Sequence, residues 1–381
     1  MKLALYSLAI LISGGLLIGA YFYPFEHETY NTDYVAQVPI QIPPPFVVTH
    51  TKTPTPVKAL YMSSWVAGNK KLRDNLVKLI DETELNAVVI DIKDYTGHIS
   101  YMVENPVLKE FGSSRNRIPD IKQFIGELHE KGIYVIGRIS VFQDSYLVQT
   151  KPEYAVTDKE GKVWRDRKGI AWLDVGAKPV WDYITLIGED AYSVGFDEIN
   201  FDYIRFPSDG DMKNIAYPFS QGKVKSVALK EFFAHLDQKF HSKNIPISAD
   251  LFGMTTSNND DLGIGQILGD ALVHFDFVAP MVYPSHYPPN FLGFQSPAGK
   301  PYEVIKFAMD RAVVKAGIAS TSPTKLRPWL QDFSIGKVSY TPEMVKAQIQ
   351  ATYDSGLDSW MLWNASNVYT RSALELQVSG Y

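Results

Sequence analysis

Beyond residue 56, short runs of hydrophobic and β-branched residues alternate with longer amphipathic patterns. Short runs of this kind predict β-strands, and apolar residues recurring every three or four positions predict helices. Eight strand-like runs occur, at residues 58–65, 87–94, 133–140, 196–203, 245–251, 275–283, 326–333 and 358–363. Helical patterns lie between them at 71–82, 121–132, 180–195, 227–240, 302–317 and 341–356, and several end at glycine, as helix C-termini often do.

This alternation predicts repeated βα units around a parallel sheet. Eight units in one domain predict an α/β protein with a (β/α)8 TIM barrel over residues 57–381. An open doubly wound sheet alternates in the same way, but the chain lacks the Gly-rich phosphate-binding turn typical of many such folds, which favours the barrel. The long connections at 141–177 and 204–222 are expected to carry substrate-binding residues, and residues 159–172 have the pattern of a hairpin over the barrel mouth.

The N-terminal residues predict where the protein is located. Lys2 is followed by residues 3–23 without a single charge, long enough to span a bilayer as a signal anchor. Residues 24–56 are rich in proline and lack periodicity, which predicts an extended linker. The positive-inside rule then places a single-pass protein in the cytoplasmic membrane with its barrel on the extracytoplasmic side. Secretion after cleavage of a signal peptide is the alternative.

Composition narrows the range of partners and chemistries. The net charge is −5 and the basic residues are scattered, so we expect no nucleic-acid partner. The chain has no cysteine, which excludes disulfides, thiolate metal sites and a cysteine nucleophile. Its 8 histidines form no metal-binding motif, and no Gly-x-Ser-x-Gly elbow is present, so we expect neither a metal nor a cofactor.

The fourth strand-like run contains the clearest candidate chemistry. Side chains alternate along a barrel strand, so apolar Ile199 and Phe201 should face the helices while Glu198, Asn200 and Asp202 face the axis. Asp202 lies at the C-terminal end, where barrel active sites occur, and is the first candidate catalytic residue. A structural alternative is that Glu198 and Asp202 pair with Arg138 or Arg205, and for the deeper Glu198 this alternative is favoured.

Neighbouring runs add further polar residues at the same end. Asp250 ends the fifth run on the inward side and can pair with Asp202, because glycoside cleavage needs one protonated and one ionised carboxyl. Arg138 is a candidate for orienting a carboxylate or binding a sugar hydroxyl, and Asp94 at the tip of the second run is a candidate substrate contact. Later strand ends carry aromatic and amide side chains suited to pyranose faces and hydroxyls, and we select Tyr283, His286, Gln331, Asp332 and Trp363 as candidate substrate-binding residues. Glu198, Asn200 and Arg205 of the fourth run are further candidates for substrate binding.

The stretch GFDEINFDYIRFP resembles the fourth-strand signature of a bacterial family of glycosyl hydrolase-like barrels, described as domains of unknown function and often secreted or membrane-anchored. The resemblance extends from Val57 to the C-terminus through KALYMSSW, VVIDIKDYTGHISY, GRISVFQD, SADLFG, APMVYPSHY and SWMLWNA. It implies a glycosidase barrel in which Asp202 is nucleophile or acid, Asp250 its partner and Asp332 a strand-seven helper. Amylase-like barrels carry glutamate as the acid at strand five, so Asp250 departs from that pattern and the acid assignment stays open.

We therefore expect a glycoside hydrolase that acts on a polysaccharide or oligosaccharide outside the cytoplasmic membrane. A non-catalytic glycan-binding barrel would keep the aromatic residues without needing two spaced carboxyls. An envelope scaffold that binds another protein through residues 141–177 is a third reading.

Overall fold

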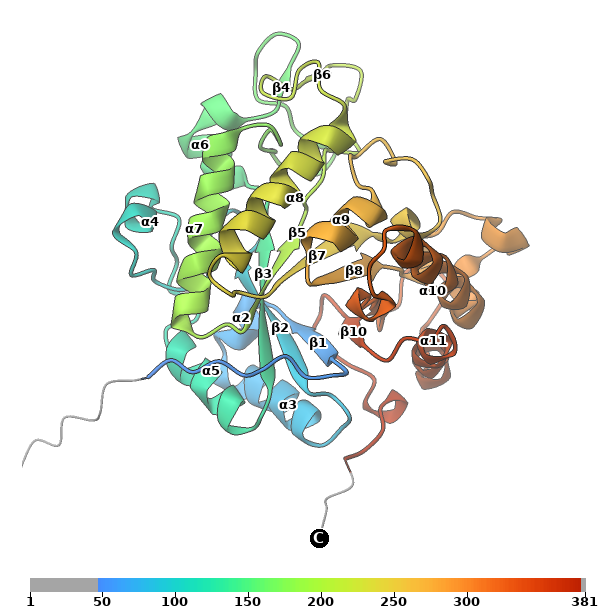
Figure 1. The fold of residues 1–381 in the computed structure, drawn as a ribbon. Coiled ribbons are helices and arrows are strands. Elements are labelled where there is room, and N and C mark those ends of the chain that lie inside the picture. The colour runs from blue at the N-terminus through green and yellow to red at the C-terminus, as the bar shows by residue number, and fades with distance from the viewer. Residues whose placement is uncertain (1–46, 378–381) are drawn as a thin grey trace, which may run out of the picture. The chain divides into compact units, whose positions relative to one another are not determined.

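The computed structural model describes residues 47–377, in which eight parallel strands close into a barrel (Figure 1). The strands run around the barrel in the order β1-β10-β9-β8-β7-β5-β3-β2. Their bounds are β1 Lys58–Met62, β2 Ala87–Lys93, β3 Tyr134–Ser140, β5 Glu198–Asp202, β7 Ile247–Phe252, β8 Phe277–Met281, β9 Trp329–Gln331 and β10 Trp360–Trp363. The predicted TIM barrel is confirmed, and the closed sheet excludes the open doubly wound alternative.

Helices surround the barrel on the outside. The six predicted helical patterns form α3 Lys70–Asp81, α5 Ile121–Glu130, α7 Lys178–Val194, α8 Lys225–His241, α10 Pro301–Ile318 and α11 Pro342–Asp354. Shorter helices occupy the connections, namely α2 Ser64–Ala67, α4 Pro106–Phe111, α6 Ser145–Thr150 and α9 Leu268–His274. Short 3-10 turns lie at 152–154, 253–256, 284–286, 291–293, 297–299, 323–325 and 371–373.

The first strand ends earlier than its hydrophobic run predicts. The run continues to Trp65, but β1 stops at Met62 because Ser63 caps the short helix α2, accepting a hydrogen bond from the Val66 backbone N–H. Trp65 therefore leaves the barrel and is 66% exposed.

Side chains of alternating parity divide the core into two layers. One layer packs the outward faces of the strands against the helices, with Leu60, Val88 and Phe201 among its members. The other fills the barrel interior and includes Tyr61, Tyr134, Tyr283, Trp329 and Met361. This alternation makes one parity of each strand available to the barrel axis, as a packed TIM barrel requires.

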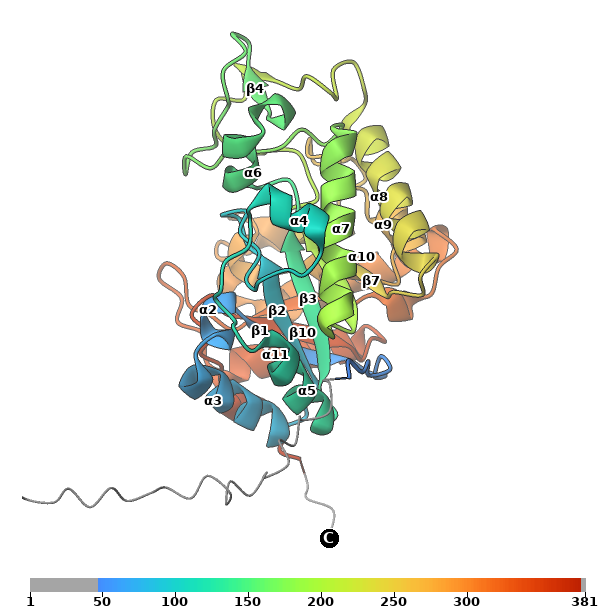
Figure 2. The same cartoon turned by 90° about the vertical axis from the view of Figure 1, so that its left-hand side faces the viewer.

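The long connections after β3 and β5 meet at one end of the barrel. Two short strands, β4 Thr157–Asp158 and β6 Ile215–Ala216, pair there in antiparallel fashion, and Figures 1 and 2 show them beyond α6. Antiparallel bridges join Thr157 to Val163 and Arg165 to Ala171, so the stretch predicted as one hairpin over 159–172 forms two successive turns instead.

Residues 47–56 contain no helix or strand and cross the opposite end of the barrel. The Thr51 N–H donates to Asp197 Oδ1 at 2.6 Å, and the Thr53 hydroxyl lies 2.9 Å from the Tyr134 hydroxyl. No helix within residues 47–377 is long and apolar enough to cross a membrane. The predicted anchor at 1–23 and the linker residues 24–46 lie outside the described residues.

Candidate active site

Two aspartates from neighbouring strands meet at one arginine. Arg138 on β3 pairs in register with Asn200 on β5, and Asn200 pairs with Ser248 on β7. Two residues further on, Asp202 and Asp250 reach the C-terminal end of their strands. Because the Asp202 Oδ2 lies 3.1 Å and the Asp250 Oδ2 3.8 Å from the same Arg138 Nε, the two oxygens are at most about 7 Å apart.

Both carboxylate oxygens of Asp202 accept hydrogen bonds from N–H donors. Its Oδ2 accepts from Arg138 Nη2 at 2.5 Å as well as from Nε, and its Oδ1 accepts from the Tyr203 backbone N–H at 2.6 Å. Tyr203 adopts φ +52°, a left-handed conformation that costs free energy in a non-glycine residue and is often found at functional sites. This turn directs the Tyr203 N–H back to the carboxylate.

Asp250 has the opposite character. It is 1% exposed, and burial together with the neighbouring Asp202 carboxylate raises the pKa of Asp250 to about 8. Its Oδ1 accepts from Asn200 Nδ2 at 3.0 Å and from Trp329 Nε1 at 2.8 Å. Both donors bind the same oxygen, which leaves Oδ2, 3.8 Å from Arg138 Nε, as the oxygen free to carry a proton.

Arg138 is surrounded by more negative groups than it can balance. Besides Asp202, its Nη1 donates to Asp91 Oδ1 at 2.7 Å, and the Tyr61 hydroxyl donates to the other oxygen of Asp91 at 2.6 Å. One guanidinium group thus lies within 4 Å of three carboxyl groups. Two of them make direct hydrogen bonds to it, and Asp250 is the one left to keep its proton.

Asp202 and Asp250 line a cavity of about 280 Å³ at the C-terminal end of the strands. Its wall is mainly aromatic, and it is lined by Arg138, Asp202, Tyr203, Arg205, Asp250, Phe252, Met281, Tyr283, His286, Trp329 and Trp363. Tyr283 and Trp329 are buried beneath it, and the Trp363 ring stacks on Tyr61 at 4.1 Å between centroids. Rigid aromatic surfaces beside carboxyls suit a sugar ring, whose faces are apolar and whose edge is polar.

The stretch 159–172 contacts Arg205, one of the residues that line this cavity, through Trp172. The Trp172 ring lies 4.8 Å from the Arg205 guanidinium, and its Nε1 donates to Asp166 Oδ2 at 3.0 Å. Gln143 donates to the same Asp166 oxygen at 3.3 Å. The two long connections therefore cooperate to hold Arg205 at the cavity.

The structure brings together seven of the residues selected from the sequence: Asp202, Asp250, Arg138, Arg205, Tyr283, His286 and Trp363. Asn200 lies directly beneath, as a donor to Asp250. Glu198 is fully buried below this layer, where it binds Arg327 at 2.9 Å and accepts from the Tyr134 hydroxyl.

Three further candidates lie away from the cavity. Asp94 pairs with Arg117 at 2.7 Å, and Asp332 accepts from the backbone N–H and the hydroxyl of Thr370. Gln331 ties two loops together, since it accepts from the Ser285 N–H and donates to the Phe333 carbonyl. Their observed contacts are structural.

The cavity also contains residues outside that selection. Phe252 and Met281 share the parity of Asp250 and Tyr283 on their strands, so the alternation already contained the signal for both. Tyr203 gave no such signal, because its parity is opposite to that of Asp202 and only the left-handed turn brings it to the cavity.

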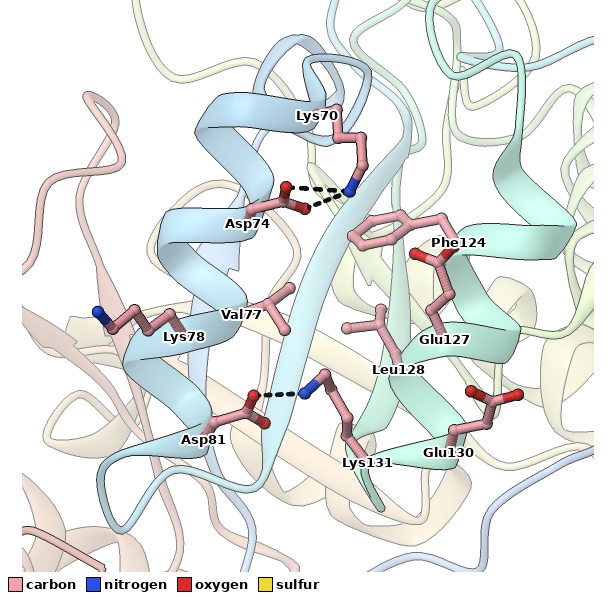
Figure 3. A pocket seen from close by; sticks show the side chains of 10 residues that line it. All are labelled: Lys70, Asp74, Val77, Lys78, Asp81, Phe124, Glu127, Leu128, Glu130 and Lys131. Atoms are coloured by element: carbon pink, nitrogen blue, oxygen red, sulfur yellow. Dashed lines mark hydrogen bonds and ion pairs between the residues drawn. The ribbon is translucent and has the colours of Figure 1, made fainter.

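A second pocket, of about 510 Å³, lies between α3 and α5 in the outer helix layer (Figure 3). Its charged side chains pair with each other, Lys70 with Asp74 at 3.0 Å and Lys131 with Asp81 at 2.6 Å. None of the inward-facing carboxyls described above reaches it. This pocket therefore offers no comparable chemistry.

Comparison with known proteins identifies the family and related folds. The family model described as "Putative glycosyl hydrolase domain" matches residues 59–369. A hypothetical protein from Ruminiclostridium thermocellum ATCC 27405 is 34% identical over 54% of this chain and 98% of its own, with a TM-score of 0.47. No curated protein sequence matches the chain.

Two glycosidase structures share the fold at low identity. The PgaB (BpsB) glycoside hydrolase domain from Bordetella bronchiseptica has a TM-score of 0.60 and 15% identity, covering 85% of this chain and 100% of its own. TtGalA, an alpha-galactosidase from Thermus thermophilus in complex with stachyose, has a TM-score of 0.51 and 13% identity, covering 85% of this chain and 64% of its own.

Proposed function

The chain belongs to the family of putative glycosyl hydrolase domains, and on that premise we propose that it hydrolyses a glycosidic bond with Asp250 as general acid and Asp202 as its ionised partner. The observation that carries the proposal is the pairing of two carboxyls at one arginine in contrasting surroundings. Asp202 accepts three N–H donors, whereas the pKa of Asp250 is raised to about 8. A glycosidase needs this division between an acid and a base or nucleophile.

Asp250 and Asp202 have different roles in the proposed reaction. Asp250 donates the proton on Oδ2 to the glycosidic oxygen, so the leaving sugar departs as an alcohol. Asp202 meets the developing positive charge at the anomeric carbon, either by attacking it or by activating water. Arg138 binds and orients Asp202, and the aromatic wall positions the sugar ring.

The spacing of the carboxyls favours direct attack by Asp202. Retaining glycosidases hold their carboxyls about 5 to 5.5 Å apart and inverting enzymes about 6.5 to 9.5 Å. The upper bound of about 7 Å covers the first range fully and only the lower edge of the second. The released sugar should therefore keep its anomeric configuration, which proton NMR of the fresh product measures.

We further propose that the substrate is a polysaccharide or oligosaccharide outside the cytoplasmic membrane. The location rests on the uncharged segment at residues 3–23, read as an anchor or, alternatively, as a cleaved signal peptide. TtGalA, which shares the barrel, was solved with stachyose, in keeping with a sugar in this cavity.

The deciding experiment is reducing-end release from a panel of bacterial and plant polysaccharides by the full-length chain. Asp202→Asn and Asp250→Asn should each lower release at least about a hundredfold. Asp74→Asn, in the pocket between α3 and α5, is the matched control and should leave it unchanged. On aryl glycosides with good leaving groups, only Asp250→Asn should regain activity, because such substrates need no acid.

Polymer binding that all the variants retain, with no release by the wild type, would contradict the proposal and support the non-catalytic glycan-binding barrel. Equal effects of the two substitutions on activated and natural substrates would contradict the division of roles.

A further inference from the structure

Arg205 differs from the other arginine of the cavity in its lack of a carboxylate. Its Nη1 donates to the Phe206 carbonyl at 3.0 Å and to the Ser208 hydroxyl at 3.2 Å, both neutral acceptors. Within residues 47–377, no Asp or Glu oxygen lies within 4.0 Å of its guanidinium. Arg138, by contrast, is in contact with Asp91 and Asp202.

The Arg205 side chain is nevertheless held in place. Its guanidinium carbon lies 4.8 Å from the Trp172 ring centroid and 5.5 Å from that of Tyr203. Trp172 is fully buried and is anchored through its Nε1 to Asp166. An arginine stacked in this way loses little further side-chain entropy when it binds a ligand.

This arrangement costs free energy in the free protein. Burial lowers the pKa of Arg205, which shows that the surroundings disfavour its charge, yet a guanidinium stays protonated at any physiological pH. Arg205 is only partly exposed, and aromatic rings and two neutral acceptors supply only part of what a carboxylate would.

The nearby carboxyls of the cavity are engaged with the other arginine. Asp202 and Asp91 bind Arg138, and Asp250 Oδ2 lies 3.8 Å from the same guanidinium, so none of the three forms an ion pair with Arg205. A ligand that brought a negative charge next to Arg205 would complete the site. The planar fork of a guanidinium matches a carboxylate with two parallel hydrogen bonds.

Resting on the hydrolase function proposed above, we infer that the substrate is an acidic glycan, with the carboxylate of a uronic acid or similar acidic sugar bound by Arg205. Because Arg205 and Asp202 line the same cavity, the acidic sugar lies at or next to the sugar whose bond is cleaved. Trp172 and Asp166 act as positioning residues for that contact.

The test compares each acidic polymer with its own uncharged form. The full-length chain is titrated with polygalacturonate, alginate and hyaluronan, each beside a carboxyl-reduced preparation of the same polymer, in calorimetry and in reducing-end assays. The wild type should bind at least one acidic form about tenfold more tightly than its reduced counterpart, and the preference should weaken with added salt.

Variants of Arg205 test whether this residue causes the preference for the acidic polymer. Arg205→Gln should abolish the preference. Arg205→Lys should retain part of it, because the positive charge remains while the planar guanidinium fork is lost. Arg167→Gln, an exposed arginine of the stretch 159–172, is the matched control and should leave the preference unchanged. Circular dichroism and thermal unfolding of each variant exclude a folding defect.

Three outcomes would overturn the inference: no acidic form binds, reduced and acidic forms bind equally, or Arg205→Gln keeps the preference. A preference for sulfated or phosphorylated polymers over carboxylated ones would also overturn it. Cleavage of neutral polymers that depends on Asp202 and Asp250 would leave the hydrolase proposal standing without this one. Arg205-dependent binding of an acidic polymer that is never cleaved would support the acidic-glycan inference and contradict the hydrolase proposal.

Discussion

The indole Nε1 of Trp329 donates a hydrogen bond to Asp250 Oδ1 at 2.8 Å, so strand β9 holds the carboxyl that strand β7 supplies. The ring also forms part of the cavity wall. Trp329 thus links the sugar-binding surface to the protonation of the candidate acid.

Replacing Trp329 by Phe should raise the pKa of Asp250 further, because an N–H donor stabilises the ionised carboxylate more than the neutral acid. The alkaline limb of the pH profile of kcat/KM should move up by about one unit. Trp360→Phe is the control, since its Nε1 binds the Tyr353 hydroxyl outside the barrel interior. An unmoved limb in Trp329→Phe, or an equal shift in Trp360→Phe, would show that this hydrogen bond does not tune the acid.

The raised pKa of Asp250 also predicts a pH dependence of stability. The folded state holds the Asp250 proton up to about pH 8, whereas the unfolded chain releases it near the ordinary value of 3.8. The contribution of this group is therefore complete at low pH and is lost as the pH rises toward 8. Asp250→Asn mimics the protonated side chain and cannot ionise.

Relative to the wild type, Asp250→Asn should gain stability steadily from pH 5 to pH 8, on the order of 2 to 4 kcal/mol, and then level off. Calorimetric unfolding across that range measures the difference. Asp182→Asn, on the exposed face of α7, serves as the control and should give a difference that does not vary with pH. A flat difference for Asp250→Asn would mean that Asp250 is already ionised at pH 5.

The pair formed by Glu198 and Arg327 should matter for stability and not for substrate binding. Both side chains are almost completely buried and 2.9 Å apart, so Glu198→Gln leaves a buried guanidinium without its carboxylate. We expect a loss of about 3 to 5 kcal/mol on unfolding, with much of it recovered in the double variant Glu198→Leu, Arg327→Met. The KM of the folded enzyme at low temperature should stay within about threefold of the wild type. A large rise in KM alone would instead assign Glu198 to substrate.

Two glycine-to-alanine substitutions should have opposite effects. Gly253 follows β7, and a Cβ there would lie 2.3 Å from the Met281 carbonyl oxygen, a backbone atom that cannot move without displacing the end of β8. Phe252 and Met281 line the cavity, so Gly253→Ala should lower both stability, by about 1 to 3 kcal/mol, and activity. Gly269→Ala in α9 meets only an ordinary contact at 3.9 Å and should stabilise the protein by up to about 1 kcal/mol. Thermal unfolding of the two variants beside the wild type measures whether Gly253→Ala lowers the stability and Gly269→Ala raises it.

Much of the fold was predictable because local patterns encode it. Strand runs of alternating parity and helices with a 3.6-residue period occur in the sequence at their final places, and eight such units close into only a few topologies. The same parity placed Asp202, Asp250 and Arg138 on the barrel axis. The end of β1 was misjudged because the cap at Ser63 outweighs a hydrophobic run that continues to Trp65.

Strand parity and strand direction can be read along the chain, and they predict which side chains point into the barrel and at which end they gather. The partners of these side chains depend on how the strands pack: Glu198 meets Arg327, 129 positions away in the chain, and Trp329 meets Asp250, 79 positions away. The raised pKa of Asp250 and the position of Arg205 away from any ion pair within residues 47–377 depend on the same packing. A pKa and an ion pair depend on distances and burial, and those exist only once distant segments have packed together.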